Sequence, residues 1–151
     1  MVKEDIERNF GFLVHDVARL LRTAFDRRMK EVGLTRSQWW VLNNLFQHNG
    51  VNQAELAQFL EVERPTLGRL IDRLENKGWV KRVADANDRR AKRIFLTEEV
   101  APTIRTMRKI ARETRSDALT EIPKRDREEL VNILIKIKKN LLKPESTEAK
   151  E

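Results

Sequence analysis

The sequence predicts a mainly α-helical protein with one small β-hairpin. Of its 151 residues 36% are charged, and only five are Gly and four are Pro, which favours long solvated helices over a sandwich or a barrel. Apolar residues recur at helical spacing through most of the chain, and the pattern changes to strand-like alternation between Trp79 and Leu96. The length fits one ordinary domain, or one domain with extra helices that pair it with a second copy.

Two helices are expected before the breaker pair Asn49-Gly50. The first runs from Ile6 to about Gly33, and its apolar residues are spaced by three and four at Phe10, Leu13, Val14, Val17, Leu21, Ala24 and Phe25. The second begins at Thr35, because Thr35 and Gln38 have the spacing of a capping box. Each of these helices therefore has one apolar face.

A short helix and a longer helix follow. Asn52 and Glu55 repeat the capping pattern in front of a helix that is too short to be stable without a tertiary partner. Pro65 suits the first turn of the longer helix, and Gly78 suits its C-terminal end. The apolar face of the longer helix carries Leu67, Leu70, Ile71 and Leu74. A short helix joined by a tight turn to a longer one is the arrangement of a helix-turn-helix motif.

The rest of the chain predicts a hairpin and two more helices. The alternating runs 79–83 and 92–96 flank the turn-favouring residues 85–90. Thr97 is expected to cap a long helix with Ile104, Met107, Ala111, Thr114 and Ala118 on one face. After Pro123, a last helix carries Leu130, Leu134, Ile137 and Leu141 at heptad-like spacing. The predicted organisation is a central lobe, 35–97, with flanking helices in 1–34 and 98–143 and a disordered polar tail, 144–151.

The net positive charge is concentrated in the central lobe. Residues 64–97 contain ten Lys and Arg against four Asp and Glu, so they supply +6 of the formal net charge of +7. Clustered Lys and Arg dominate affinity for nucleic acid because they neutralise phosphates, whereas an evenly spread surplus would mainly favour solubility. This segment is therefore predicted to contact a polyanion.

The longer helix of the lobe is predicted to present a polar face to DNA. Its apolar face must point to the core, which places Thr66, Arg69, Arg73 and Asn76 on the opposite side. A helix of this size fits the major groove, where polar side chains read base edges. The alternative interpretation is a solvated basic face, which is common on soluble proteins.

The hairpin favours the DNA interpretation. A ribbon of this kind can straddle phosphates and insert an Arg into a minor groove. The basic residues near its tip are Lys81, Arg82, Arg89, Arg90, Lys92 and Arg93. Asp88 precedes Arg89 and Arg90 and is expected to hold one guanidinium in place, so that less side-chain entropy is lost on binding.

Three segments together resemble the multiple-antibiotic-resistance regulator (MarR) family, nearest its SlyA-like branch. They are Leu34-Thr-Arg-Ser-Gln-Trp39, Leu74-Glu-Asn-Lys-Gly-Trp-Val-Lys-Arg82 and Asp88-Arg-Arg-Ala-Lys-Arg-Ile-Phe-Leu-Thr97. The resemblance implies a winged helix-turn-helix homodimer that binds a pseudo-palindromic operator, usually as a repressor. It also implies that the wing arginines are Arg89 and Arg90, and that the recognition helix contacts DNA through Arg64, Pro65, Thr66 and Arg69.

The flanking helices independently suggest a dimer. Their apolar faces are too extensive for the central lobe to cover, so they need a partner surface. A second copy of the chain would supply one, and two-fold symmetry would set the recognition helices about 34 Å apart, one turn of duplex. The alternative is an intramolecular helical bundle.

The resemblance further implies a small, often aromatic or anionic effector, bound between the dimerisation helices and the central lobe. Candidate ligand residues are His15, Arg19 and Arg22 on the first helix and Trp39 and Trp40 on the second. Cationic and aromatic groups suit an anion-bearing ring. Trp39 is better explained as a core residue, and the alternative interpretation of His15 and the arginines is a solvated face.

Other functions are disfavoured by the composition. The chain has no Cys and two His, so no disulfide, cofactor or structural metal is expected. The adjacent acidic pairs Glu98-Glu99 and Glu128-Glu129 point in different directions on helices, and no Gly-rich phosphate loop occurs, which argues against an enzyme. No apolar run approaches the about 18 residues of a membrane span, so a soluble cytoplasmic protein is expected. A sequence-neutral architectural DNA-binding protein and a protein-interaction module remain alternatives.

Overall fold

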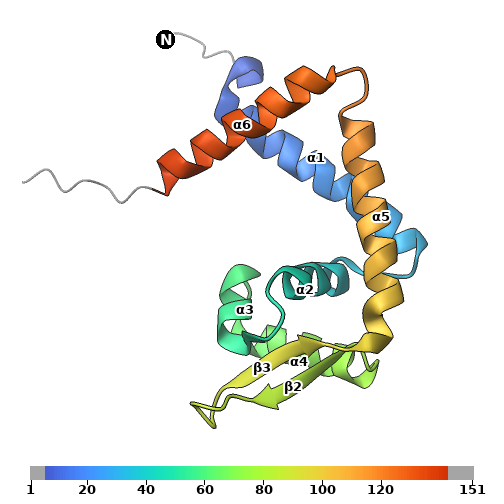
Figure 1. The fold of residues 1–151 in the computed structure, drawn as a ribbon, viewed down its shortest axis with the longest axis vertical. Helices are drawn as coiled ribbons and strands as arrows, with labels where there is room; N and C mark the ends of the chain where they lie inside the picture. The colour runs from blue at the N-terminus through green and yellow to red at the C-terminus, as the bar shows by residue number, and fades with distance from the viewer. Residues whose placement is uncertain (1–5, 143–151) are drawn as a thin grey trace, which may run out of the picture. The chain divides into compact units, whose positions relative to one another are not determined.

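The computed structural model describes residues 6–142 and confirms the mainly α-helical class (Figure 1). In chain order the elements are η1 (Ile6–Arg8), α1 (Phe10–Glu31), α2 (Arg36–Gln47), β1 (Val51–Asn52), α3 (Gln53–Phe59), α4 (Arg64–Asn76), β2 (Val80–Ala84), β3 (Lys92–Leu96), η2 (Glu98–Val100), α5 (Ala101–Ala118) and α6 (Lys124–Leu141). The chain divides into two compact units, one up to Arg115 and one from Ser116 on. The predicted tail, 144–151, lies outside the described residues.

The helices α1, α2 and α3 begin where polar side chains cap them. Thr35 and Gln38 form both hydrogen bonds of the predicted capping box: the Gln38 N–H donates to Thr35 Oγ1 at 3.3 Å, and the Thr35 N–H donates to Gln38 Oε1 at 3.1 Å. Asn52 Oδ1 accepts from the Ala54 N–H at 2.8 Å and starts α3. The first α-helix begins later than predicted because Asn9 caps it at Phe10, after the separate turn η1.

The core of the first unit joins the short helices to the sheet. Its fully buried side chains include Leu42 and Leu45 of α2, Leu56 of α3, Ile71 of α4 and Ile94 of β3. Burying an aliphatic side chain of this size contributes roughly 1.5–3 kcal/mol relative to leaving it exposed. This shared burial stabilises α3, which is too short to be stable alone, and holds α4 against it.

The sheet has three antiparallel strands in the order β1-β3-β2, one more than the predicted hairpin. Strands β2 and β3 pair along their whole length, as the alternating pattern predicted. The additional strand β1 pairs Val51 with Ile94. Asn49 Oδ1 also accepts from the Leu96 N–H at 2.9 Å. These bonds tie the hairpin to the end of α2.

The start of α5 differs from the prediction. Thr97 makes no capping hydrogen bond, because its hydroxyl donates instead to the carbonyl oxygen of Gly78. The turn η2 separates Thr97 from α5, which begins at Ala101. The prediction that Thr97 caps this helix is therefore wrong. Its side chain closes the junction after α4, where Gly78 adopts a φ of 72°.

Helices α1 and α6 carry many exposed apolar side chains. Within α1 only Met29 is buried, and the N-terminal half of the helix exposes Phe10, Phe12, Leu13, Val14, Val17 and Leu20. In the second unit α6 has no buried residue and exposes Leu130, Val131, Ile133, Leu134, Ile135 and Leu141. Apolar surfaces of this extent indicate contact with a partner.

Candidate nucleic-acid interface

Helix α4 turns a polar and basic face to solvent. It buries Leu67, Ile71 and Leu74 and leaves its predicted reading face exposed, namely Thr66, Arg69, Arg73 and Asn76. Pro65 lies in the first turn and is also exposed. The N-cap residue Glu63 makes no side-chain capping hydrogen bond. Apart from Pro65, which has no backbone N–H, the first turn of α4 can therefore offer its N–H groups to an external acceptor, and phosphates bind well at helix N-termini.

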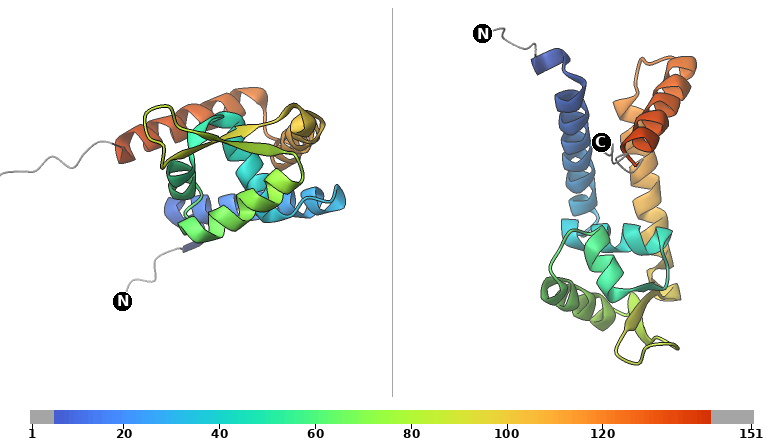
Figure 2. Two further views of the ribbon diagram at one scale, coloured as in Figure 1. Left: turned by 90° about the horizontal axis from the view of Figure 1, so that it is seen from below. Right: turned by 90° about the vertical axis from the view of Figure 1, so that its left-hand side faces the viewer.

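A hollow of about 400 Å³ lies where α3, α4 and the hairpin meet. The hairpin and α4 occupy the same side of the first unit (Figure 2). Four predicted site residues line the hollow: Arg64 from α4, and Asp88, Arg90 and Lys92 from the hairpin. Three cations and one carboxylate line the hollow, so its net charge is positive and it suits a phosphate group.

The opposite wall of this hollow was not predicted as part of the site. It consists of Asn52, Gln53 and Ala54 at the start of α3. The capping pattern of Asn52 and Glu55 identified this helix start in the sequence, and the core contacts of α3 with α4 bring it beside the hairpin.

The hairpin turn, residues 85–91, is held by two carboxylates. Asp88 Oδ1 accepts from the backbone N–H of Arg90 at 2.9 Å, so Asp88 orders the backbone of the turn. The sequence had suggested that Asp88 would hold a neighbouring guanidinium instead. The guanidinium that is held belongs to Arg93, whose Nε donates to Asp85 Oδ2 at 2.8 Å. The Asn87 N–H and the Arg93 guanidinium lower the pKa of Asp85. Arg89 and Arg90 are exposed at this ordered turn.

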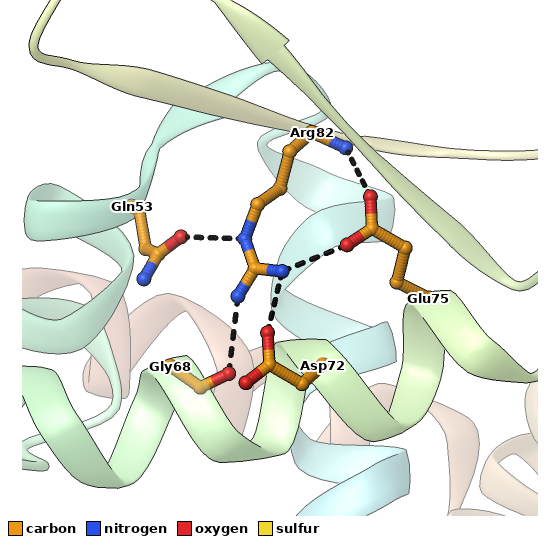
Figure 3. A network of polar contacts seen from close by, with 5 residues as sticks. All are labelled: Gln53, Gly68, Asp72, Glu75 and Arg82. Atoms are coloured by element: carbon orange, nitrogen blue, oxygen red, sulfur yellow. Dashed lines mark hydrogen bonds and ion pairs between the residues drawn. The ribbon is translucent and has the colours of Figure 1, made fainter.

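Arg82 is the predicted DNA contact that the structure places differently (Figure 3). Its side chain is 20% exposed, and its Nη1 lies 2.6 Å from Asp72 Oδ1 and 2.7 Å from Glu75 Oε2. Its Nε donates to Gln53 Oε1 and its Nη2 to the Gly68 carbonyl oxygen, both at 3.1 Å. The guanidinium is thus engaged inside the lobe, and we do not carry Arg82 forward as a phosphate contact.

The alternation of β2 explains this placement. Val80 is buried, and side chains two residues apart on a strand point to the same face. Arg82 pairs with the buried Ile94 of β3 and therefore lies on the inner face of the hairpin. Lys81, on the other face of β2, is exposed to solvent, as was expected for both Lys81 and Arg82.

A second hollow, of about 350 Å³, lies between α1, α2 and α5. Three of the predicted ligand residues line it: Arg22, Trp39 and Trp40. Its lining also includes Arg115 and Phe25, which were not predicted. Arg115 directly follows Thr114, which lies on the expected apolar face of α5. This position at the edge of the face is the feature of the sequence from which its place in the hollow could have been predicted. The hollow combines two cations with aromatic walls.

The other two predicted ligand residues lie elsewhere. Arg19 forms an ion pair with Asp16 along α1 at 3.3 Å. His15 lines a separate surface hollow with Asn9, Gly11 and Phe12. Trp39 is 5% exposed and packs edge-on against Phe25, with ring centroids 4.5 Å apart, so its interpretation as a core residue is confirmed.

Within residues 6–142, no group of three His, Cys, Asp or Glu side chains is arranged to hold a metal ion. In the same part of the chain, none of the helices combines the length and apolar character that crossing a membrane requires.

The chain is similar to known transcriptional regulators. The profile of the MarR family matches residues 34–92. The crystal structure of the transcriptional regulator PA3341 is 41% identical, covering 88% of this chain and 98% of that one, with a TM-score of 0.75. A MarR transcriptional regulator from Methanosarcina mazei Go1 is 30% identical over 87% of this chain and 95% of its own, with a TM-score of 0.76.

A third solved structure is of the transcriptional repressor CouR bound to a 23-mer DNA duplex. It is 29% identical and covers 91% of this chain and 98% of that chain, with a TM-score of 0.70. These relatives extend over nearly the whole chain and share its winged arrangement of helices and sheet. The protein therefore belongs to the MarR family of transcriptional regulators.

Proposed function

We propose that the protein represses transcription by binding a pseudo-palindromic operator as a homodimer, with α4 in the major groove and the wing, residues 80–96, in a flanking minor groove. The observation that carries this proposal is the hollow in which Arg64 of α4 meets Arg90 and Lys92 of the wing, beside the exposed reading face. The DNA-bound relative CouR supports it. We also assign the protein to the SlyA-like branch, on the motif of residues 88–97.

The proposed contacts divide by role. Thr66 and Arg69 read base edges, since they lie on the exposed face of α4. Arg64, Pro65 and Arg73 contact the DNA backbone beside these bases. In the wing, Asp88 orders the turn that carries the phosphate contacts Arg89, Arg90 and Lys92. The flanking segments, 1–34 and 98–143, pair two copies through the apolar side chains of α1 and α6.

Selection of DNA fragments by the pure protein, followed by sequencing, tests this function. The selected fragments should share one palindrome, and the protein should prefer it over bulk DNA by about a thousandfold or more. A sequence-neutral architectural protein would bind all fragments alike. The common sequence then supplies the operator for the experiments below. Because the proposed partner is genomic DNA, we place the protein in the cytoplasm.

Arg69→Ala should relax the preference for one operator position and cost about 1–3 kcal/mol of binding free energy, because a base contact is lost while the fold is kept. Repeating the selection with this variant measures the effect at every position. An unchanged selected sequence would show that Arg69 contacts only the backbone or water.

Arg90→Ala should weaken binding to all DNA sequences and reduce the slope of log Kd against log salt by about one, because one phosphate contact is lost. Fluorescence anisotropy on operator and bulk DNA at several salt concentrations measures both quantities. Arg112→Ala, an exposed arginine of α5 outside the proposed interface, is the matched control. Equal slopes in the two variants would exclude Arg90 from the contact.

The hollow between α1, α2 and α5 is our proposed effector site, for an aromatic ring that bears an anionic group. Trp39 and Trp40 offer ring faces and edges, and Arg22 and Arg115 offer positive charge. The hollow joins α1 to the winged lobe, so a ligand there can favour one spacing of the recognition helices over another. Quenching of tryptophan fluorescence by aromatic carboxylates, with release of operator DNA, tests the site. Quenching without release of operator DNA would show that the hollow binds the carboxylate but does not control DNA binding.

A further inference from the structure

Arg82 joins three elements of the winged lobe through one side chain. From β2 its guanidinium reaches Gln53 at the start of α3, and it reaches the Gly68 carbonyl oxygen and the Asp72 and Glu75 carboxylates along α4 (Figure 3). The backbone N–H of Arg82 adds a bond to Glu75 Oε1 at 3.2 Å. We name this set of contacts the Arg82 brace.

The guanidinium has little capacity left for DNA. An arginine carries five N–H donors in a fixed fork, and the four acceptors that the guanidinium contacts, three on side chains and one on the backbone, account for most of them. Hydrogen bonds between ionised groups are also stronger than neutral ones. A phosphate would therefore have to displace bonds that are already made.

The brace also changes the charge beside the reading face. Asp72 is 61% exposed and follows Arg69 by three residues, so both lie on neighbouring positions of the same side of α4. Glu75 is 41% exposed. Without a cation these two carboxylates would repel the phosphate backbone, and Arg82 reduces this repulsion because its charge offsets one of the two negative charges.

We propose that Arg82 is a positioning residue for operator recognition: it fixes the wing relative to α4 and offsets part of the negative charge of Asp72 and Glu75, without touching DNA itself. This inference rests on the proposed reading face. Sequence preference needs the base contacts of α4 and the wing contacts to be made together. An unbraced wing would still attract DNA by its charge but would no longer favour one sequence as strongly.

Asp72→Ala with Glu75→Ala separates the brace from a direct phosphate contact. If Arg82 is a brace, the preference for operator over bulk DNA falls by about tenfold or more, because charged hydrogen bonds are lost. This fall occurs although the variant gains two positive charges. If Arg82 instead binds phosphate, freeing it strengthens binding to both DNAs, steepens the salt slope by about one and leaves the preference intact. That outcome overturns the proposal.

The matched control is Glu113→Ala with Glu128→Ala, which makes the same change in charge. These carboxylates lie 3.9 Å from Lys109 and 3.8 Å from Lys124 in exposed pairs along helices, which contribute little to stability. The control should keep the wild-type preference. A fall in the control equal to that in the test variant would assign the effect to charge alone and overturn the brace.

Single substitutions of Arg82 give an independent readout. Arg82→Lys retains the charge but not the fork of donors, so it should lose preference as the double variant does. Arg82→Ala should lose preference with an unchanged salt slope, in contrast to Arg90→Ala. A slope lower by about one in Arg82→Ala would overturn the brace. Absence of a preferred operator in the wild-type protein would overturn both this inference and the proposed function, whereas normal preference in every brace variant would overturn the inference alone.

Discussion

Trp39→Ala is expected to lower the free energy of unfolding by about 3–5 kcal/mol, which is the usual cost of removing a large buried aromatic side chain. Trp39 is 5% exposed, and its ring packs edge-on against Phe25 and Trp40 with centroid distances of 4.5 and 5.3 Å. Its indole N–H donates to Asp26 Oδ1 at 2.7 Å. The alanine variant therefore leaves a cavity and a carboxylate without this donor.

Two further variants divide this loss into its parts. Trp39→Phe keeps an aromatic ring but removes the donor to Asp26, so it should cost about 1–3 kcal/mol. Trp40→Ala removes the neighbouring ring, which is 39% exposed, and should cost less than Trp39→Ala. Urea unfolding followed by circular dichroism, at one protein concentration, measures all three. A larger loss for Trp40→Ala would contradict the assignment of Trp39 to the core.

Gly50→Ala is expected to destabilise the fold by about 2–5 kcal/mol, the sum of backbone strain and steric overlap. Gly50 adopts a φ of 82°, and a Cβ placed there would lie 2.6 Å from Cε1 of the Phe95 ring. The Gly50 N–H donates to the Ile94 carbonyl oxygen at 2.8 Å, which fixes the backbone at this point. The Phe95 ring would have to shift to make room for the added Cβ.

Gly33→Ala is the matched control for this effect. Gly33 has a similar φ of 79°, but nothing lies within 4 Å of the Cβ that alanine would add. It should therefore show the backbone cost alone, about 1–2 kcal/mol. The difference between the two variants in thermal unfolding measures the overlap with Phe95. Equal losses would show that the ring moves aside without cost.

The sequence predicts those features whose causes lie within a few residues. Thr35 and Gln38 cap the same helix end, and the apolar face of α4 is set by the helical period alone. By contrast, β1 contains two residues, too few to show any alternation, and it exists because Val51 meets Ile94 across the fold. The same limit applies to Thr97, whose acceptor is the carbonyl oxygen of Gly78.

The candidate site shows the same division. Arg90 and Lys92 were predicted from charge and Arg64 from the family resemblance, and the fold brings them to one hollow. Charge did not predict the intrachain contacts of Arg82, because its acceptors come from α3 and α4, which are distant from it in the sequence. The alternation of β2 from the buried Val80 explains why Arg82 lies on the inner face. The pairing of Asp85 with Arg93 likewise depends on the register of the hairpin.

Helix α1 buries a single side chain, Met29, in its own chain. Its remaining apolar surface contributes to stability once a second copy covers it, so the free energy of association adds to the stability of the folded chain. Mass action then makes the protein more stable when it is abundant than when it is scarce. An operator that holds two chains together would act in the same direction, so both protein concentration and DNA would raise the fraction of copies that are folded.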